Sequence, residues 1–319
     1  MSGIVSIHNR LYTYYDLERD LQELAICYPD STELTSLGQT LDHRQIYCLR
    51  LHGTKGFTKH AVVFQAAMHA REWKNAQLLM MMAERFLRCY GEDILWEGIP
   101  YRQLLRHYDV YILPMVNPDG VQISQFGSEG IIDPVLRQEL QEKIATQREA
   151  RRWKGNAKGV DLNRIFTEEA LDQPESIVLR DLVNAVSPQL TINYHSTGQV
   201  IFYRQFFTAL EYMSRRTGYP LVLETGKPVG SFGDYLTEQG KKWCTIETGA
   251  WEAPVGHMQI YAWWMRQKAC FRLFLHRFYA KMEILKLPLN DRWSFPGKYK
   301  LWGKTYAGKN GSVDQLGGV

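Results

Sequence analysis

The stretch "HAVVFQAAMHARE", residues 60–72, joins a strand-like apolar run to two side chains that can bind a metal ion. Its first part, 60–70, is compact and apolar without clean alternation, which predicts a strand buried on both faces of a sheet. His69 and Glu72 stand three positions apart where this run ends. The pair is either half of a metal site or an ordinary polar patch.

Four further runs have the same character, and helical patterns separate them. The strand-like runs are residues 46–53, 108–120, 190–198 and 241–249. The helical patterns cover residues 13–28, 73–90, 134–152, 176–186 and 257–284. Strands that alternate with helices predict an α/β sandwich around a largely parallel or mixed sheet. Ligands of such folds bind at the carboxyl ends of the strands.

Length and composition predict one globular domain over residues 1–319. The 319 residues are 45% hydrophobic and 23% charged, and no internal repeat or linker-like break divides them. Residues 288–319, rich in Gly, Lys and aromatic side chains, are expected to form a C-terminal surface tail. The sequence does not predict an oligomeric state.

Charge and cysteine usage narrow the partners and the compartment. A net charge of +4 is too small to predict nucleic acid as the main partner. No run approaches 18 uncharged apolar residues, so no membrane span is expected. The five cysteines are scattered without CxxC spacing, and no secretory signal is visible, so we expect a cytoplasmic protein with reduced thiols.

The spacing of His69 and Glu72 is weak evidence by itself, because nine histidines and 34 acidic residues give about one such match by accident. His195 strengthens the case, since it too ends an apolar run. Two imidazoles and a carboxylate form the ligand set of a catalytic zinc that keeps a position for water. Glu247, at the end of the run 241–249, is a candidate base; the alternative is a salt-bridged structural carboxylate.

The segment "RRWKGNAKGVDLNRIF", residues 151–166, offers groups for a substrate. The guanidinium of Arg164 and the amide of Asn163 can bind a free carboxylate together. Asp161 can accept the outer N–H of a zinc-binding histidine. The alternative is a solvated basic loop.

Together these residues resemble the carboxypeptidase A-like zinc peptidases. The matching pieces, in the family's order, are "HARE" (69–72), "NPDG" (117–120), "GVDLNR" (159–164), "NYHS" (193–196) and "TIETG" (245–249). The resemblance implies a three-layer α/β/α sandwich with a mixed, mostly parallel sheet of about eight strands. It also implies one zinc ion per chain.

The resemblance assigns roles residue by residue. His69, Glu72 and His195 would bind zinc, and Glu247 would act as general base and then as proton donor. Arg71 would help to polarise the scissile carbonyl, and Asp161 would orient His69. Asn163 and Arg164 would hold the terminal carboxylate of the substrate.

Four departures from the digestive members of the family bear on specificity. Lys154 follows Trp153 where those members have an oxyanion-binding arginine, so we expect it to supply only a point charge to the substrate. Gly233 stands at the position that shapes their specificity pocket, and we expect a roomy pocket there. No tyrosine occupies the expected place in 224–236, and Ile165 replaces an asparagine.

The segments "RRWKGNAKGVDLNR" and "GSFGDY" are most similar to the bacterial branch that cleaves γ-D-glutamyl-meso-diaminopimelate in cell-wall peptides. We therefore expect a peptidase acting on small murein peptides during cytoplasmic recycling. Two alternatives stay open. One is an ordinary metallocarboxypeptidase that removes C-terminal L-amino acids, and the other is a non-catalytic relative that binds murein fragments.

Overall fold

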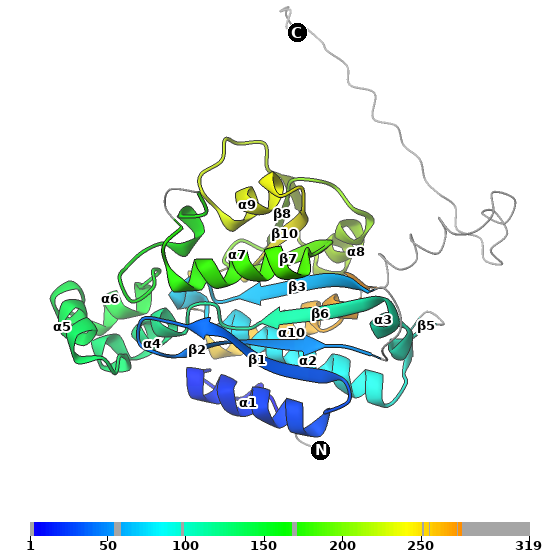
Figure 1. The fold of residues 1–319 in the computed structure, drawn as a ribbon, viewed down its shortest axis with the longest axis horizontal. Coiled ribbons are helices and arrows are strands. Elements are labelled where there is room, and N and C mark those ends of the chain that lie inside the picture. The colour runs from blue at the N-terminus through cyan, green and yellow to red at the C-terminus, as the bar shows by residue number, and fades with distance from the viewer. Residues whose placement is uncertain are drawn as a thin grey trace, which may run out of the picture. The chain divides into compact units, whose positions relative to one another are not determined.

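A mixed eight-stranded sheet organises the computed structural model (Figure 1). The structure describes residues 3–53, 59–96, 99–167, 171–250, 252–254, 256–272 and 274–275, and the expected tail at 288–319 lies outside them. The strands of the sheet are β1 (Thr32–Gln39), β2 (Gln45–Leu51), β3 (His60–Ala66), β6 (Tyr108–Leu113), β7 (Leu190–Ser196), β8 (Val200–Tyr203), β9 (Leu221–Leu223) and β10 (Lys242–Thr248). A separate hairpin pairs β4 (Leu95–Trp96) with β5 (Ile99–Pro100).

The strand order is β1-β2-β6-β3-β7-β10-β8-β9. The four central strands β6, β3, β7 and β10 are parallel, whereas β1, β2 and β8 join their neighbours toward the centre in antiparallel pairs. The parallel strands β3, β7 and β10 are adjacent, so their carboxyl ends lie together at one edge. The expected mixed sheet of about eight strands is confirmed.

Helices cover both faces of this sheet. The helices are α1 (Tyr14–Cys27), α2 (Lys74–Gly91), α3 (Tyr101–His107), α4 (Pro118–Phe126), α5 (Pro134–Lys143), α6 (Gln147–Arg152), α7 (Pro174–Val186), α8 (Thr208–Thr217), α9 (Phe232–Glu238) and α10 (His257–Gln267), with short 3-10 turns η1 (Ala70–Glu72), η2 (Gly127–Gly130) and η3 (Leu162–Arg164). Helices α1, α2 and α10 belong to one hydrophobic core and α7 and α9 to another. Among the described helices, we find none long and apolar enough to cross a lipid bilayer.

Strand β3 shows why the predicted runs lack alternation. Its Val62 and Phe64 pack into the core beneath α1 and α2, and Val63 packs into the core beneath α7 and α9. Successive side chains point to opposite faces of a strand, so a strand covered on both faces needs apolar residues at every position.

Two predicted elements differ from the observed ones for local reasons. The run 108–120 stops as a strand at Leu113, because Asn117 caps α4 by accepting from the backbone N–H of Gly120 (2.9 Å). The helical pattern 134–152 divides into α5 and α6. A capping box starts α6, in which Thr146 accepts from the Glu149 N–H (3.2 Å) and Glu149 accepts from the Thr146 N–H (3.0 Å).

Candidate active site

Three candidate metal ligands meet at the carboxyl edge of the parallel strands. His69 and Glu72 come from the loop and the η1 turn after β3, and His195 lies on β7. One ligand atom from each lies within 4.8 Å of the others, and all three side chains are buried. Glu72 Oε1 lies 2.9 Å from His69 Nδ1, and Glu72 Oε2 lies 3.1 Å from His195 Nδ1.

The donor set suits a divalent cation. The Nδ1 atoms of His69 and His195 face each other at 3.1 Å, and both face the Glu72 carboxylate. Two imidazole nitrogens and a carboxylate are the usual protein ligands of a catalytic zinc ion. These residues therefore fit zinc through their Nδ1 atoms and a Glu72 oxygen.

Asp161 fixes the ring of His69. Its Oδ1 lies 3.1 Å from His69 Nε2, so the Nε2–H can be donated to Asp161 while Nδ1 keeps its lone pair for a metal ion. Burial alone would lower the pKa of His69, but Glu72 and Asp161 raise it to about 9. Lys154 donates to Asp161 Oδ2 at 2.7 Å, so its ammonium is directed to this carboxylate.

The loop that carries His69 is held by backbone and side-chain contacts. Ala67 adopts a positive φ of 52°, which turns the chain sharply out of β3. Asn117 secures the turn, since its Nδ2 donates to the carbonyls of Met68 (3.0 Å) and Gly155 (3.1 Å). A Cβ at Gly120 would lie 2.5 Å from the Gly155 carbonyl oxygen, which explains the glycine in "NPDG".

A buried network of hydroxyl and amide groups supports the other ligands, and no motif in the sequence predicts it. Asn75 donates to Ser196 Oγ (2.9 Å) and accepts from Thr248 Oγ1 (2.7 Å). The Ser196 N–H donates to Glu72 Oε2 (3.1 Å). Ser196 and Thr248 directly follow His195 and Glu247 in the chain, and Asn75 stands three positions after Glu72. The network ties α2, β7 and β10 together behind the ligands.

Glu247 lies beside the ligands without a polar partner. The parallel register of β10 and β7 pairs it with His195, and the described residues offer its carboxylate no hydrogen bond or ion pair. Burial raises the pKa of Glu247 to about 8, and the negative charge of Glu72 adds to this shift. A cation bound opposite would favour the ionised form. The carboxylate is thus buried, unpaired and next to the metal position.

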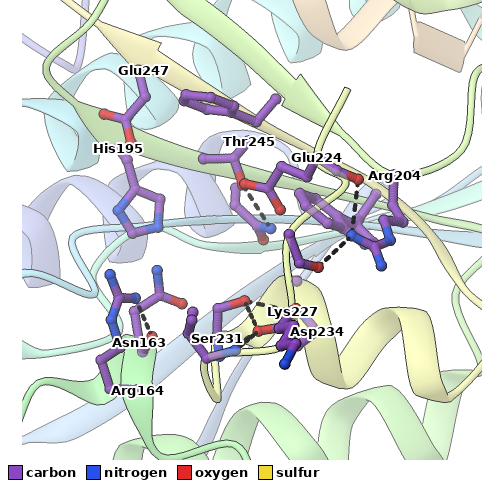
Figure 2. Close-up of a pocket in the computed structure, with 16 residues that line it drawn as sticks. Asn163, Arg164, His195, Arg204, Glu224, Lys227, Ser231, Asp234, Thr245 and Glu247 are labelled. Atoms are coloured by element: carbon purple, nitrogen blue, oxygen red, sulfur yellow. Dashed lines mark hydrogen bonds between the residues drawn. The ribbon is translucent and has the colours of Figure 1, made fainter. Parts of the chain in front are cut away.

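A cavity of about 350 Å³ opens from Glu247 and His195, as Figure 2 shows; we call it the Glu247 cavity. Asn163 and Arg164 line it near that end, and Arg204 and Glu224 line its other end. The structure therefore places both predicted carboxylate-binding residues in the cavity that contains Glu247. Asn163 also accepts from the Phe232 N–H (2.9 Å), which fixes η3 against α9.

Gly233 lies on the wall of the Glu247 cavity, as expected of a residue that shapes the pocket. A Cβ there would lie 2.8 Å from the ring of Trp243, because the indole on β10 packs against the backbone of α9. Only glycine therefore fits this position, and whether it makes the pocket roomy stays a prediction. Tyr203 packs on the core with α1 and α2, whereas its neighbours Phe202 and Arg204 line the cavity.

Arg71 points toward a different cavity. Its Nη1 lies 3.8 Å from Glu252, which also accepts from Arg152 at 2.9 Å. Glu252 and Arg152 line a cavity of about 830 Å³ with Arg10, Arg148 and Arg151, which we call the arginine cavity. Trp73, which follows the ligand Glu72 directly, lines it too. A second cavity thus adjoins the segment that carries His69 and Glu72.

Comparison with known proteins identifies the family. Residues 17–227 match the family described as zinc carboxypeptidase, although this match ends before Glu247. Gamma-D-glutamyl-L-diamino acid endopeptidase 1 of Lysinibacillus sphaericus is 24% identical over 277 residues, or 76% of this chain and 67% of that protein. Carboxypeptidase D of Rattus norvegicus is 26% identical over 186 residues, which cover 57% of this chain and 12% of that protein.

Solved structures show the same fold. Carboxypeptidase A from Helicoverpa armigera superposes with a TM-score of 0.58 at 20% identity, covering 83% of this chain and 74% of that chain. Thrombin-activatable fibrinolysis inhibitor gives a TM-score of 0.62 at 18% identity, with 84% and 74% covered. The fold, the ordered motifs and the match over most of the chain agree. The chain belongs to the zinc carboxypeptidase family of peptidases.

Proposed function

We propose that this peptidase hydrolyses the amide between γ-D-glutamate and meso-diaminopimelate in small cell-wall peptides. The amide bond in question lies next to a free carboxylate, and Asn163 and Arg164, which line the same cavity as Glu247, support such a substrate. The proposal rests on the charge pattern of the Glu247 cavity and on the similarity to an endopeptidase whose name specifies the γ-D-glutamyl-L-diamino acid bond.

The residues of the chain can perform the proton transfers of hydrolysis. Held by His69, Glu72 and His195, a zinc ion would supply Lewis-acid activation of water and of the scissile carbonyl. Glu247 would take the proton of the attacking water and then deliver it to the departing amine. Its carboxylate has no competing partner among the described residues, so it is free to carry a proton between these positions.

The charged residues that line the Glu247 cavity support the proposed substrate. Glu224 is half-buried, burial raises its pKa, and its carboxylate has no partner within the described ranges. Arg204 holds this loop by donating to the carbonyls of Glu224 (2.8 Å) and Gly226 (3.2 Å). The cavity therefore presents both signs of charge beyond the carboxylate-binding pair Asn163 and Arg164.

Meso-diaminopimelate matches this pattern. Its α-carboxylate would bind Asn163 and Arg164, its distal ammonium would bind Glu224, and its distal carboxylate would bind Arg204. A simple aromatic or aliphatic C-terminal residue would leave the charge of Glu224 unpaired and would offer no anion to Arg204. The mixed charge of the cavity is the single observation that favours diaminopimelate over ordinary C-terminal residues.

The experiment is a comparison of substrates with the purified zinc-loaded protein. L-Ala-γ-D-Glu-meso-diaminopimelate, the L-lysine analogue without the distal carboxylate, and a set of blocked dipeptides are incubated in parallel. Release of diaminopimelate much faster than lysine supports the proposal. Faster cleavage of blocked dipeptides would instead make the protein an ordinary metallocarboxypeptidase, and binding without any hydrolysis would make it a non-catalytic relative.

The proposed physiological role is recycling of murein peptides in the cytoplasm. All five cysteines are free thiols in the structure, as a reducing compartment favours. Cell fractionation, together with the accumulation of uncleaved murein peptides in a strain that lacks this chain, would test the role. Recovery of the protein outside the cytoplasm would contradict it.

A further inference from the structure

We propose that the arginine cavity binds the acyl half of the substrate through a free carboxylate on that half. The inference rests on the proposed function and specifies it further, because it assigns recognition on the other side of the scissile amide. The amine half, with its terminal carboxylate, is accounted for by the Glu247 cavity. A peptide substrate that extends from the Glu247 cavity past the metal ligands needs a second binding surface for its acyl half.

The arginine cavity adjoins the segment that carries two of the metal ligands, although none of the three ligands lines it. Trp73 follows the metal ligand Glu72 in the chain and lines the cavity. Glu252 lies 3.8 Å from Arg71 and 2.9 Å from Arg152, so it connects the segment of the metal ligands to the basic wall. With a volume of about 830 Å³, the cavity can hold more than one residue of a peptide.

The charge of the cavity calls for an anion. Four arginines and one glutamate line it, which leaves three positive charges in excess. Arg152 is paired with Glu252, whereas no described residue pairs with the guanidinium groups of Arg10, Arg148 and Arg151. Three unpaired cations around one cavity repel each other, and a bound anion would relieve this repulsion.

Helix α6 presents these cations in a fixed arrangement. Arg148, Arg151 and Arg152 are spaced i, i+3 and i+4, so they share one face of the helix. The capping box of Thr146 and Glu149 holds the start of α6. The arginines are individually exposed, but the helix that carries them is anchored beside the site.

The chemistry of a γ-linked glutamate identifies the anion. When glutamate is joined through its side chain, its α-carboxylate stays free beside the scissile amide. An ordinary α-linked peptide has no carboxylate on the backbone at this position. Arginine forks bind carboxylates with two parallel hydrogen bonds, so the cavity can distinguish the two linkages by charge. The arginine cavity thus recognises what is particular to a γ-glutamyl acyl group.

The test compares L-Ala-γ-D-Glu-meso-diaminopimelate with the same peptide in which the α-carboxylate of glutamate is converted to an amide. The amide keeps the shape and removes the charge. We expect the free carboxylate to give a kcat/KM higher by about three- to tenfold, mainly through KM, because exposed arginine pairs contribute modestly. The double variant R148Q/R151Q should reduce this ratio to near one and leave kcat for the amidated peptide nearly unchanged.

The matched control is R216Q, which removes an exposed arginine on α8 that lines neither of the two cavities. It should keep the wild-type ratio. A preference that survives in R148Q/R151Q, or its absence in the wild-type protein, would overturn the inference.

Binding of the acyl product separates this inference from the proposed function. Calorimetry with L-Ala-D-Glu and L-Ala-D-isoglutamine needs no hydrolysis. If neither full peptide is hydrolysed, the proposed function fails, but a preference for L-Ala-D-Glu that R148Q/R151Q abolishes would still support the arginine cavity as a carboxylate site. Equal binding of the two dipeptides would overturn it.

Discussion

The Glu247 cavity and the arginine cavity differ in size, in charge and in the elements that form them. The Glu247 cavity measures about 350 Å³ and combines acids and bases on its walls, whereas the arginine cavity measures about 830 Å³ and is almost uniformly basic. A small cavity of mixed sign can specify where each charge of a ligand lies. A large cavity of one sign attracts any anion and specifies mainly its charge.

Their supports differ accordingly. The end of the Glu247 cavity at Glu247 is lined from β7 and β10, which the hydrogen bonds of the sheet fix, and the rest is lined from η3, α9 and the segments that follow β8 and β9. The arginine cavity is lined mainly from the short helix α6, part of α4 and connecting segments. The arginines of α6 are exposed and lose rotamer freedom when they bind, so each of their contacts gains less than a contact of the half-buried Glu224 or Arg204. Discrimination should therefore be strong on the amine side and modest on the acyl side.

Removal of zinc should have the largest effect, because both cavities depend on the same ligands for catalysis but not for binding. A chelator should abolish hydrolysis, and zinc should restore it in the wild-type protein but not in H195A. At zinc concentrations about 100-fold above Kd, the free energy of unfolding should rise by about 2.7 kcal/mol. Differential scanning calorimetry checks this, and an unchanged Tm on adding zinc would contradict the metal assignment.

The E247Q substitution should separate chemistry from recognition. Glutamine keeps the size of the side chain but cannot move a proton, so kcat should fall by about 1,000-fold. Zinc content and the binding of acyl and amine products should stay close to wild type, since Glu247 is not one of the three converging ligands. Steady-state kinetics with elemental analysis measures both, and near-normal turnover would remove Glu247 from the mechanism.

The E224Q substitution sharpens the comparison on the amine side. Removal of this half-buried charge should raise KM for the diaminopimelate peptide about tenfold, which corresponds to about 1.4 kcal/mol, with little change in kcat. The response to the α-amidated glutamate should be unaffected, because that group belongs to the other cavity. A large fall in kcat with unchanged KM would show that Glu224 acts on the reaction instead.

Ionic strength should give the smallest effect and should act on one cavity more than on the other. The Debye length shortens from about 30 Å at 0.01 M to about 3 Å at 1 M salt. The unpaired arginines of α6 are exposed, so KM for the peptide with a free acyl carboxylate should rise severalfold over this range. KM for the α-amidated peptide should change less, and equal salt dependence of the two would speak against an electrostatic arginine cavity.

The sequence predicts the centre of the sheet better than its edges. Strands β3, β7 and β10 are recognisable because burial on both faces demands continuous apolar residues. The edge strands β1 and β9 expose most of their residues, so their composition resembles that of loops. Neither strand was predicted, because an exposed edge imposes little pattern on the sequence.

Site residues at strand ends could likewise be placed from sequence, whereas the directions of long side chains could not. His69, His195 and Glu247 follow from the positions at which apolar runs end. Lys154 and Arg71 turn toward Asp161 and Glu252, and these partners become neighbours only through the folded loops. The indole of Trp243 against Gly233 is a tertiary contact of the same kind.

The strand order has a consequence for biosynthesis. In the sheet, β10 lies between β7 and β8, although both of these precede it in the chain. A growing polypeptide that has reached β8 already contains His69, Glu72 and His195, whereas Glu247 has still to be translated. Insertion of β10 between its two flanking strands would then complete the site, because it brings Glu247 beside His195.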